Sequence, residues 1–292
     1  MIPGAFDYHA PSTAEEALSL LAEHGDEAKL LAGGQSLIPL MRFRLADPAR
    51  LIDLNGLSEL SGLEEADGQL RIGAMTRHAD LEHSGLAADR YPLLAEAAGL
   101  VADPLVRNRG TVGGSLVHAD PAGDWGSVML ACGAELVARS ADGERTIPVD
   151  DFFFGPFTTS LGRDELLAEI RLPRSGPRSG GAYEKLERKV GDFATVGLAA
   201  RLELDEDGAV ASAGLGLTAV GPSNLRAAEA EEALVGGPPD GDRIDEAAAL
   251  AADASSPTPD NRGSADYKRD MVRVLAKRAL RRAADRAREG GS

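Results

Sequence analysis

The sequence predicts an α+β fold, with a mixed helical and stranded N-terminal part and a smaller C-terminal sheet covered by helices. Through the first two thirds of the chain, segments with the apolar spacing of helices alternate with short strand-like runs. Residues 175–181 (SGPRSGG) interrupt this alternation, because Gly, Pro and Ser disfavour regular structure. Beyond them, two strand-like segments, 194–204 and 209–219, flank the turn 205–208 and precede three helical segments.

Capping residues and apolar periodicity place the individual elements. Ser12 and Thr13 each precede a glutamate by three residues, and Gly25 follows the apolar stripe, so the first helix is predicted over 12–23. The other helical segments are predicted at 37–45 (one or two turns), 76–83, 90–100, 125–134, 224–234, 243–254 and 265–288. The strands of the first two thirds are predicted at 29–32, 50–55, 69–74, 135–139, 145–149 and 166–172.

Length and charge limit the classes of protein that fit. With 292 residues, the chain is about twice the commonest domain size, so two or three sub-domains are expected. A net charge of -16 disfavours nucleic acid and anionic membranes as partners. No apolar run approaches the length of a membrane span, and the N-terminus has no signal-peptide pattern, so the cytoplasm is expected.

The acidity and the cysteine content each have a second implication. Residues 266–289 hold nine Lys/Arg against four Asp/Glu, so this terminal helix carries +5 and the rest of the chain -21. The helix could face acidic groups of its own chain, face a partner, or be solvated. Cys132 is the single cysteine, so the chain can form neither an intrachain disulfide nor a four-thiolate iron–sulfur site.

Two segments repeat a Gly-Gly pattern next to a small hydroxyl residue. These are Gly33-Gly34-Gln35-Ser36 and Gly113-Gly114-Ser115, and each lies between an apolar run and a possible helix start. Glycines let backbone N–H groups approach a ligand closely, and a helix start adds unpaired donors, so the pair suits a diphosphate. The alternative is ordinary turn chemistry. The Gly-x-Gly-x-x-Gly and phosphate-loop signatures of common nucleotide-binding proteins are absent.

Other chemistry is weakly indicated by the residues themselves. The five histidines show no metal-ligand spacing, and solvated surface positions are the preferred interpretation, including for His78 and His83. No Gly-x-Ser-x-Gly motif marks a serine nucleophile. Asp124 follows the second Gly-Gly motif closely. It could accept a bond from a ligand, but a helix cap is the favoured interpretation from this residue alone.

These motifs, taken in order, resemble a known family. The segments 32–36, 107–115 (RNRGTVGGS) and 118–124 (HADPAGD), with 152–156 (FFFGP) and 192–196 (DFATV), resemble the FAD-binding medium subunit of the xanthine dehydrogenase and aerobic carbon monoxide dehydrogenase family. The likeness covers nearly the whole chain. It implies a vanillyl-alcohol-oxidase-type FAD-binding fold with two α+β sub-domains, 1–56 and 57–175, and a C-terminal domain, 176–292, with an antiparallel sheet and helices.

The resemblance also implies a set of cofactor contacts. Carried over by position, the residues expected to contact FAD are Ala32, Gly33, Gly34, Gln35 and Ser36 in one loop, Thr111, Val112, Gly113, Gly114 and Ser115 in the other, and Val101, Asp124, Leu167, Lys185 and Phe193 elsewhere. Three positions depart from the family pattern. Ser115 replaces a frequent Asn, Gln35 stands where His or Asn is common, and Phe193 lacks the phenol of a frequent Tyr.

In such a family the chain would be an electron-transfer component. The resemblance implies a molybdopterin large subunit that oxidises the substrate and a small subunit with two [2Fe–2S] clusters. The flavin subunit would pass the electrons of these clusters to NAD⁺, a quinone or oxygen. The lone cysteine agrees with iron–sulfur clusters that are held by another chain. Two alternatives stay open: a stand-alone FAD oxidase or dehydrogenase, and a non-redox module that has lost FAD. The substrate and the electron acceptor cannot be read from this chain.

Overall fold

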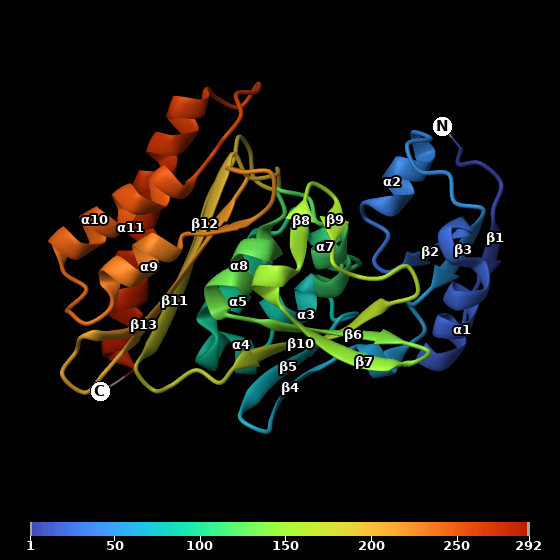
Figure 1. Ribbon diagram of the computed structural model, residues 1–292, viewed down its shortest axis with the longest axis horizontal. Coiled ribbons are helices and arrows are strands. Elements are labelled where there is room, and N and C mark those ends of the chain that lie inside the picture. The colour runs from blue at the N-terminus through green and yellow to red at the C-terminus, as the bar shows by residue number, and fades with distance from the viewer. Residues whose placement is uncertain (1, 291–292) are drawn as a thin grey trace.

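Three sheets follow one another along the long axis of the molecule. They are seen in the computed structural model, which describes residues 2–290 (Figure 1). The N-terminal sheet has the parallel order β1-β3-β2, the central sheet has the antiparallel order β4-β5-β10-β6-β7, and the C-terminal sheet has the antiparallel order β11-β12-β13-β14. A small hairpin, β8-β9, lies beside the central sheet. The fold is therefore α+β, as the sequence predicts.

The N-terminal sheet is short and is covered by α1. Its strands are β1 (Asp7–His9), β2 (Ala28–Leu31) and β3 (Arg50–Asp53), and its helices are α1 (Ala14–His24) and α2 (Leu37–Arg42). Thr13 caps α1 by accepting a hydrogen bond from the Glu16 amide at 3.2 Å, and the Glu16 carboxylate accepts from the Ser12 amide at 2.7 Å. The capping residues predicted from the sequence therefore start this helix, two residues later than expected.

The central sheet carries the helices that hold the second Gly-Gly motif and Asp124. Its strands are β4 (Leu63–Ala66), β5 (Gln69–Gly73), β6 (Glu135–Ser140), β7 (Gly143–Pro148) and β10 (Leu166–Pro173), with β8 (Phe153–Gly155) and β9 (Thr158–Thr159) as the hairpin. Its helices are α3 (His78–Glu82), α4 (Gly85–Arg90), α5 (Pro92–Leu100), α6 (Pro104–Arg107), α7 (Val112–His118) and α8 (Asp124–Cys132). Trp125, Phe152 and Tyr183 are the largest buried side chains of its core.

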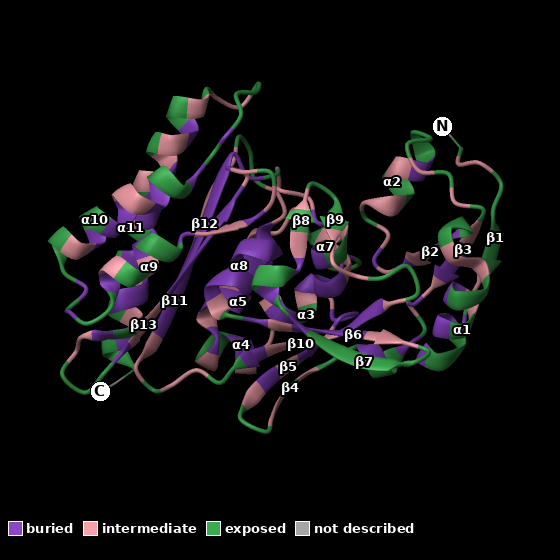
Figure 2. Ribbon diagram, in the orientation of Figure 1, coloured by how far each residue is buried: buried purple, intermediate pink, exposed green. Residues whose placement is uncertain are grey.

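The C-terminal sheet lies between two layers of helices. Its strands are β11 (Ser179–Leu186), β12 (Val196–Leu204), β13 (Val210–Thr218) and β14 (Leu225–Arg226), and its helices are α9 (Ala228–Leu234), α10 (Gly241–Ala254) and α11 (Ala265–Glu289). On one face the sheet packs against α5 and α8, and on the other against α9 and α11, with α10 outside them (Figure 1). Figure 2 shows the buried residues concentrated along these strands and in α8.

The second half of the segment 175–181 differs from the sequence prediction. Its Gly, Pro and Ser content predicts no regular structure, but β11 begins at Ser179 and pairs with β12 over its whole length. The role of the segment as a domain boundary stays a prediction. The glycines serve packing here, since a Cβ at Gly180 would lie 2.1 Å from the carbonyl oxygen of Ala283 in α11. β11 is the edge strand of a four-stranded sheet, so the predicted hairpin of β12 and β13 is part of a larger sheet.

The basic helix α11 packs along its own chain. Its buried face runs from Lys268 to Ala287. Arg282 pairs with Glu96 and Glu184 at 2.7 Å, and Arg286 pairs with Glu96 at 2.8 Å. Of the three interpretations left open, these contacts support acidic groups of the same chain. Within residues 2–290, no helix is long and apolar enough to cross a membrane.

Candidate cofactor site

The first Gly-Gly loop joins β2 to α2 and has a run of unpaired amides. The backbone N–H groups of residues 33–36 have no hydrogen-bond acceptor among the described residues. Gly34 has φ +75°, a left-handed conformation that favours glycine. The Asn55 side chain fixes the loop by donating to the Ala32 carbonyl at 2.8 Å. Successive unpaired amides form a concave donor surface, which is a suitable site for an anion such as a phosphate.

The backbone amides of the second Gly-Gly loop are already hydrogen-bonded within the protein. Val112 donates to the Thr76 carbonyl at 3.0 Å and Gly113 to the Ala74 carbonyl at 2.9 Å. Thr111 caps α7, because its hydroxyl accepts from the Gly114 amide at 3.1 Å. A Cβ at Gly113 would lie 2.5 Å from the Cβ of Ala74 and 2.7 Å from its carbonyl oxygen. The glycine there permits close packing of α7 on the end of β5.

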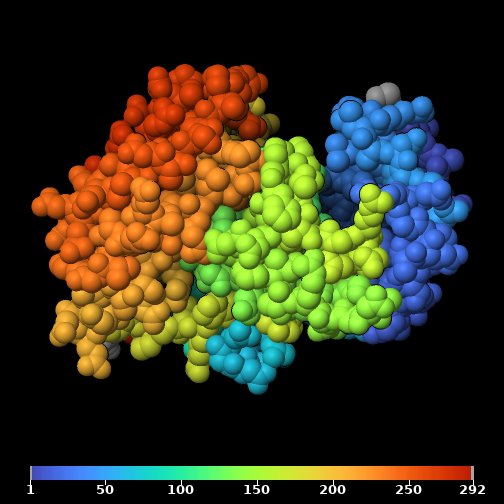
Figure 3. All heavy atoms as spheres, viewed as in Figure 1, coloured from blue at the N-terminus to red at the C-terminus, as the bar shows by residue number. Residues whose placement is uncertain are grey.

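The two loops lie against each other. A Cβ at Gly33 would lie 2.3 Å from the Arg109 carbonyl oxygen and 2.6 Å from the Gly110 Cα. Arg77 connects both sides, because its guanidinium donates to Asn55 Oδ1 at 2.6 Å and to the Arg109 carbonyl. The structure therefore brings together the two motifs that are about 80 residues apart in the sequence. Figure 3 shows a hollow between the region of α2 and the β8-β9 segment, and the first loop borders it on the α2 side.

Asp124 lies in a buried polar cluster next to the second loop. Its Oδ1 accepts from the Tyr183 hydroxyl at 2.7 Å, and its Oδ2 accepts from Lys185 Nζ at 3.0 Å. Lys185 Nζ also donates to the Leu100 carbonyl at 2.9 Å, and its side chain is only 1% exposed. The favoured interpretation of Asp124 as a helix cap is therefore wrong. Gly123 is the N-cap of α8, and the carboxylate turns to partners on β11 instead.

Burial sets the protonation of this cluster. It raises the pKa of Asp124, while the Lys185 ammonium and the Tyr183 hydroxyl act in the opposite direction. Burial and the nearby Asp124 carboxylate raise the pKa of Tyr183 well above its ordinary value, so the phenol stays protonated and donates. A Cβ at Gly123 would lie 3.9 Å from the Ser115 hydroxyl oxygen, so this cluster and the second loop are neighbours.

The remaining predicted contacts lie at different depths. Val101 ends α5, next to the Leu100 carbonyl that Lys185 binds. Phe193 is 51% exposed in the loop after β11, and Gly191 of that loop lies against Ala102. Val101 therefore borders the Asp124 cluster, and the loop of Phe193 lies against the residue that follows Val101. Leu167, by contrast, is buried in the core of the central sheet on β10, and its role as a cofactor contact stays a prediction.

His78 is buried rather than solvated, which corrects the sequence interpretation. Only 4% of it is exposed, and its Nδ1 accepts from Trp125 Nε1 at 3.0 Å. Burial, with the positive charges of Arg107 and Arg77, lowers the pKa of His78 to about 4. The ring is therefore neutral at pH 7 with its proton on Nε2. Its backbone amide donates to the Gly110 carbonyl at 3.1 Å, so His78 connects α8 to the second loop.

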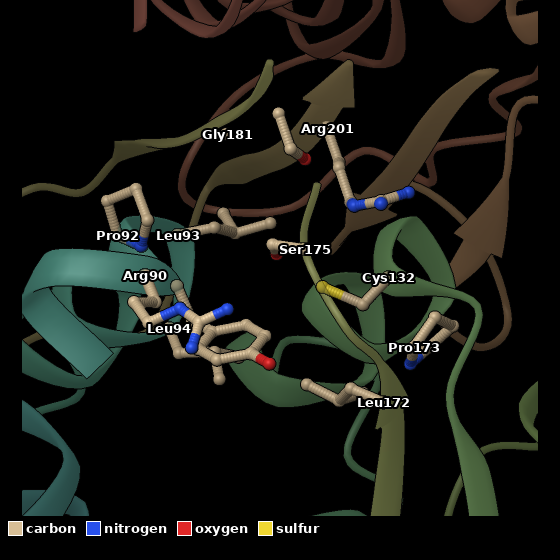
Figure 4. A pocket seen from close by; sticks show the side chains of 12 residues that line it. Arg90, Pro92, Leu93, Leu94, Cys132, Leu172, Pro173, Ser175, Gly181 and Arg201 are labelled. Carbon is tan, nitrogen blue, oxygen red and sulfur yellow. The ribbon is translucent and has the colours of Figure 1, made fainter. Parts of the chain in front are cut away.

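Two other features do not form a cofactor site. The pocket in Figure 4, between Leu93, Cys132 and Arg201, has a volume of 30 Å³ and holds only about one or two water molecules. Burial raises the pKa of the Cys132 thiol to about 11, so it is not a thiolate at neutral pH. No group of three or more His, Cys, Asp or Glu within residues 2–290 could hold a metal ion.

Sequence reasoning missed Tyr183, which shares a face of β11 with Lys185, and Glu187, which directly follows the strand and lies 3.8 Å from Lys185 Nζ. A strand places alternate residues on the same face, so the spacing of positions 183 and 185 indicates that the two side chains lie together. That signal was hidden because the strand itself was not predicted.

Comparison with known proteins identifies the family. Residues 4–175 match the family described as the FAD binding domain in molybdopterin dehydrogenase, and residues 181–283 match the CO dehydrogenase flavoprotein C-terminal domain. The chain belongs to this family of FAD-binding medium subunits, and its cofactor is FAD.

Individual relatives cover almost the whole chain. It is 44% identical over 280 residues to the carbon monoxide dehydrogenase medium chain of Hydrogenophaga pseudoflava, which covers 96% of this chain and 97% of the relative. It is 40% identical to the 6-hydroxypseudooxynicotine dehydrogenase complex subunit alpha of Paenarthrobacter nicotinovorans, with 99% and 97% covered.

Solved structures show the same architecture. The carbon monoxide dehydrogenase from Hydrogenophaga pseudoflava that lacks the Mo-pyranopterin moiety matches with a TM-score of 0.95 and 46% identity, covering 98% of this chain and 99% of that one. Quinoline 2-oxidoreductase from Pseudomonas putida 86 matches with a TM-score of 0.91 and 34% identity, with 98% and 99% covered. An FAD-binding part followed by an antiparallel sheet with helices is therefore the fold of this chain, as the resemblance implied.

Proposed function

We propose that the chain binds FAD between its two Gly-Gly loops and transfers electrons from partner [2Fe–2S] clusters to NAD⁺, a quinone or oxygen. The observation that carries this proposal is the run of unpaired amides at residues 33–36, in a loop that lies against a second loop held in place by its own hydrogen bonds. A diphosphate needs several donors without a Cβ between them, and this surface supplies them despite the net charge of -16.

The residues around the two loops have different tasks in this proposal. The amides of 33–36 would hold the diphosphate, and the hydroxyl of Ser115, which has no hydrogen-bond partner among the described residues, would add a donor. Asp124, which is held by the Tyr183 hydroxyl, would form with Lys185 a charged surface beside Val101. The exposed ring of Phe193 would cover a face of the cofactor ring system. FAD supplies the redox chemistry, and the chain supplies position and electrostatics.

The partners follow from the family and the cysteine content. A single cysteine cannot hold two iron–sulfur clusters, so the clusters come from another chain. Relatives are named as medium chains or as subunits of dehydrogenase complexes, and one structure is described by its molybdenum cofactor. We therefore propose a molybdopterin large subunit and a [2Fe–2S] small subunit as partners, a cytoplasmic location, and a division of the chain into 1–56, 57–175 and 176–292.

Hydrogen exchange of the full chain, with and without FAD, tests the assignment of the loops. The amides at 33–36 are expected to exchange quickly in the apoprotein and to slow about a hundredfold or more with saturating FAD, because the diphosphate gives them acceptors. Residues 112–115 are expected to be protected in both states, since their amides are already bonded. Fast exchange at 33–36 in the FAD-loaded protein would contradict the assignment.

Assembly with the partners tests the transfer of electrons. Co-expressed with the molybdopterin large subunit and the [2Fe–2S] small subunit of its complex, this chain is expected to co-purify with molybdenum and iron and to have its FAD reduced when substrate is added. Alone, with FAD bound, it is expected to leave the substrates of such complexes unchanged. Turnover of a small molecule by the isolated chain would instead support the alternative of a stand-alone FAD oxidase or dehydrogenase.

A further inference from the structure

Tyr183 and Lys185 on one face of β11, with Glu187 just after the strand, form a polar series whose last member has an unsatisfied oxygen. Tyr183 and Lys185 both bind the Asp124 carboxylate, at 2.7 Å and 3.0 Å. Glu187 directly follows the last residue of β11, and its Oε2 lies 3.8 Å from Lys185 Nζ. The series leads from the core, where Tyr183 is buried, to the loop that carries Phe193.

Glu187 is the member of this series with an oxygen that lacks a hydrogen-bond partner among the described residues. Its Oε2 atom is buried, yet it has no hydrogen-bond partner within residues 2–290. A buried carboxylate oxygen without a donor is costly, and such groups are rare in native proteins unless they bind a ligand or water. Lys185 Nζ lies 3.8 Å from this oxygen, which is within ion-pair range but too long for a hydrogen bond. The two hydrogen bonds that this ammonium makes go to Asp124 and to the Leu100 carbonyl.

The charges of the cluster do not balance by themselves. Asp124 and Glu187 supply two carboxylates, while Lys185 supplies one ammonium whose side chain is 1% exposed. With both carboxylates ionised, the cluster carries one excess negative charge at a site of low dielectric. A ligand that donates a hydrogen bond would satisfy the Glu187 oxygen. The excess negative charge of the cluster would repel any further negative charge on that ligand.

We propose that Glu187 is a further FAD contact, whose Oε2 accepts a hydrogen bond from an N–H or O–H of the flavin ring or its ribityl chain and whose charge disfavours reduction of the cofactor. This inference rests on the proposed function, because it places the flavin beside Lys185 and Phe193. Glu187, at the end of β11, lies between the charged pair of Asp124 and Lys185 and the loop that bears Phe193. Electrons that arrive on FAD add negative charge, so a neighbouring carboxylate lowers the reduction potential.

Two substitutions separate the hydrogen bond from the charge. Glu187→Gln keeps an acceptor of the same shape and removes the charge, whereas Glu187→Ala removes both. Glu184→Gln is the matched control, because Glu184 lies on β11 but pairs with Arg282 on the face opposite to that of Lys185. The full chain, stripped of FAD and reloaded, is used for FAD titration and for measuring the two-electron reduction potential.

We expect Glu187→Ala to weaken FAD binding at least tenfold. Glu187→Gln should keep the affinity within about threefold and shift the reduction equilibrium about tenfold towards reduced FAD, a rise of about 30 mV. Glu184→Gln should leave both quantities at the wild-type values. Wild-type potential in Glu187→Gln, or wild-type affinity in Glu187→Ala, would overturn the inference while leaving the proposed function intact. A wild-type chain that takes up no FAD would overturn both.

Discussion

The two Gly-Gly loops have nearly the same sequence pattern but different physical roles. In the first loop the amides of 33–36 are unpaired, and Gly34 adopts a left-handed conformation. In the second loop the amides of 112–115 are all bonded to carbonyls or to the Thr111 hydroxyl. The first loop has amides free to bind a ligand, as we propose for FAD, whereas the second forms the packed surface against which the first is placed.

The comparison shows that a glycine pair does not by itself report a ligand contact. Gly113 and Gly33 are both required by close packing, the first against Ala74 and the second against Arg109 and Gly110. What distinguishes the loops is whether their N–H groups have acceptors, and that depends on the neighbouring segments. Changes in the second loop should therefore act first on stability, and changes in the first loop on FAD binding.

The largest effect is expected from Gly113→Ala. The new Cβ would lie 2.5 Å from the Ala74 Cβ and 2.7 Å from its carbonyl oxygen, and neither atom belongs to a flexible side chain. We expect the apoprotein to lose about 3 kcal/mol of unfolding free energy, measured by chemical denaturation. FAD affinity should fall as well, because the displaced second loop no longer holds the first loop in place.

Gly85→Ala is the matched control for this substitution. Gly85 also lies in the first turn of a short helix, α4, but a Cβ there would meet no heavy atom within 4 Å. Its stability should stay unchanged or rise by up to about 1 kcal/mol, because alanine favours helix more than glycine does. Equal stability of the two variants would show that α7 does not depend on contact with Ala74, and the proposed role of the second loop would be wrong.

Acid should weaken the second loop through His78. The pKa of this residue is about 4 in the folded chain and about 6.5 when unfolded, so the unfolded state binds more protons between these values. Stability is therefore lost as the pH falls through this window. From pH 7 to pH 5 the contribution of His78 is expected to fall by about 2 kcal/mol. Denaturation of the apoprotein at both pH values measures it.

His78→Asn isolates this contribution. The amide oxygen of asparagine can replace Nδ1 as the acceptor for Trp125, but it does not titrate. The variant should therefore lose less stability than the wild type between pH 7 and pH 5. If both proteins lost the same amount, His78 would not be the group that is protonated, and the acid sensitivity would belong to other residues.

The sequence located most elements because their signals are local. The caps of α1, the hairpin of β12 and β13, and the long helix α11 depend on residues within a few positions of each other. The segment 175–181 has the composition of a boundary, but its second half becomes a strand because β12 and α11, distant in sequence, pack on it. Local composition does not contain that information.

The site shows the same limit. The two glycine motifs were recognisable because their pattern is local and repeated. Asp124 binds Tyr183 and Lys185, which lie about 60 residues downstream. Tertiary contacts therefore decide whether Asp124 is a helix cap or part of a buried cluster. His78 is likewise buried by Trp125, 47 residues away. Burial of a polar residue can be predicted only when its partner is known.

The smallest effect is expected from removing the N-cap hydroxyl of α7, which tests whether this cap supports FAD binding in addition to helix stability. Thr111→Val removes the hydroxyl that accepts from the Gly114 amide, in a residue that is 2% exposed. It should cost about 1 kcal/mol and weaken FAD binding a few-fold, because the start of α7 then loosens beside the first loop. Denaturation and FAD titration measure the two effects.

Thr13→Val provides the comparison, since Thr13 caps α1 in the same way by accepting from the Glu16 amide at 3.2 Å. Thr13 is exposed, so water can replace its hydroxyl, and the loss should be nearer about 0.5 kcal/mol with unchanged FAD affinity. Both helices lose the same kind of hydrogen bond, but only α7 adjoins the first loop. A fall in FAD affinity that was equal in the two variants would mean that the second loop acts through general stability alone, and not by holding the first loop in place.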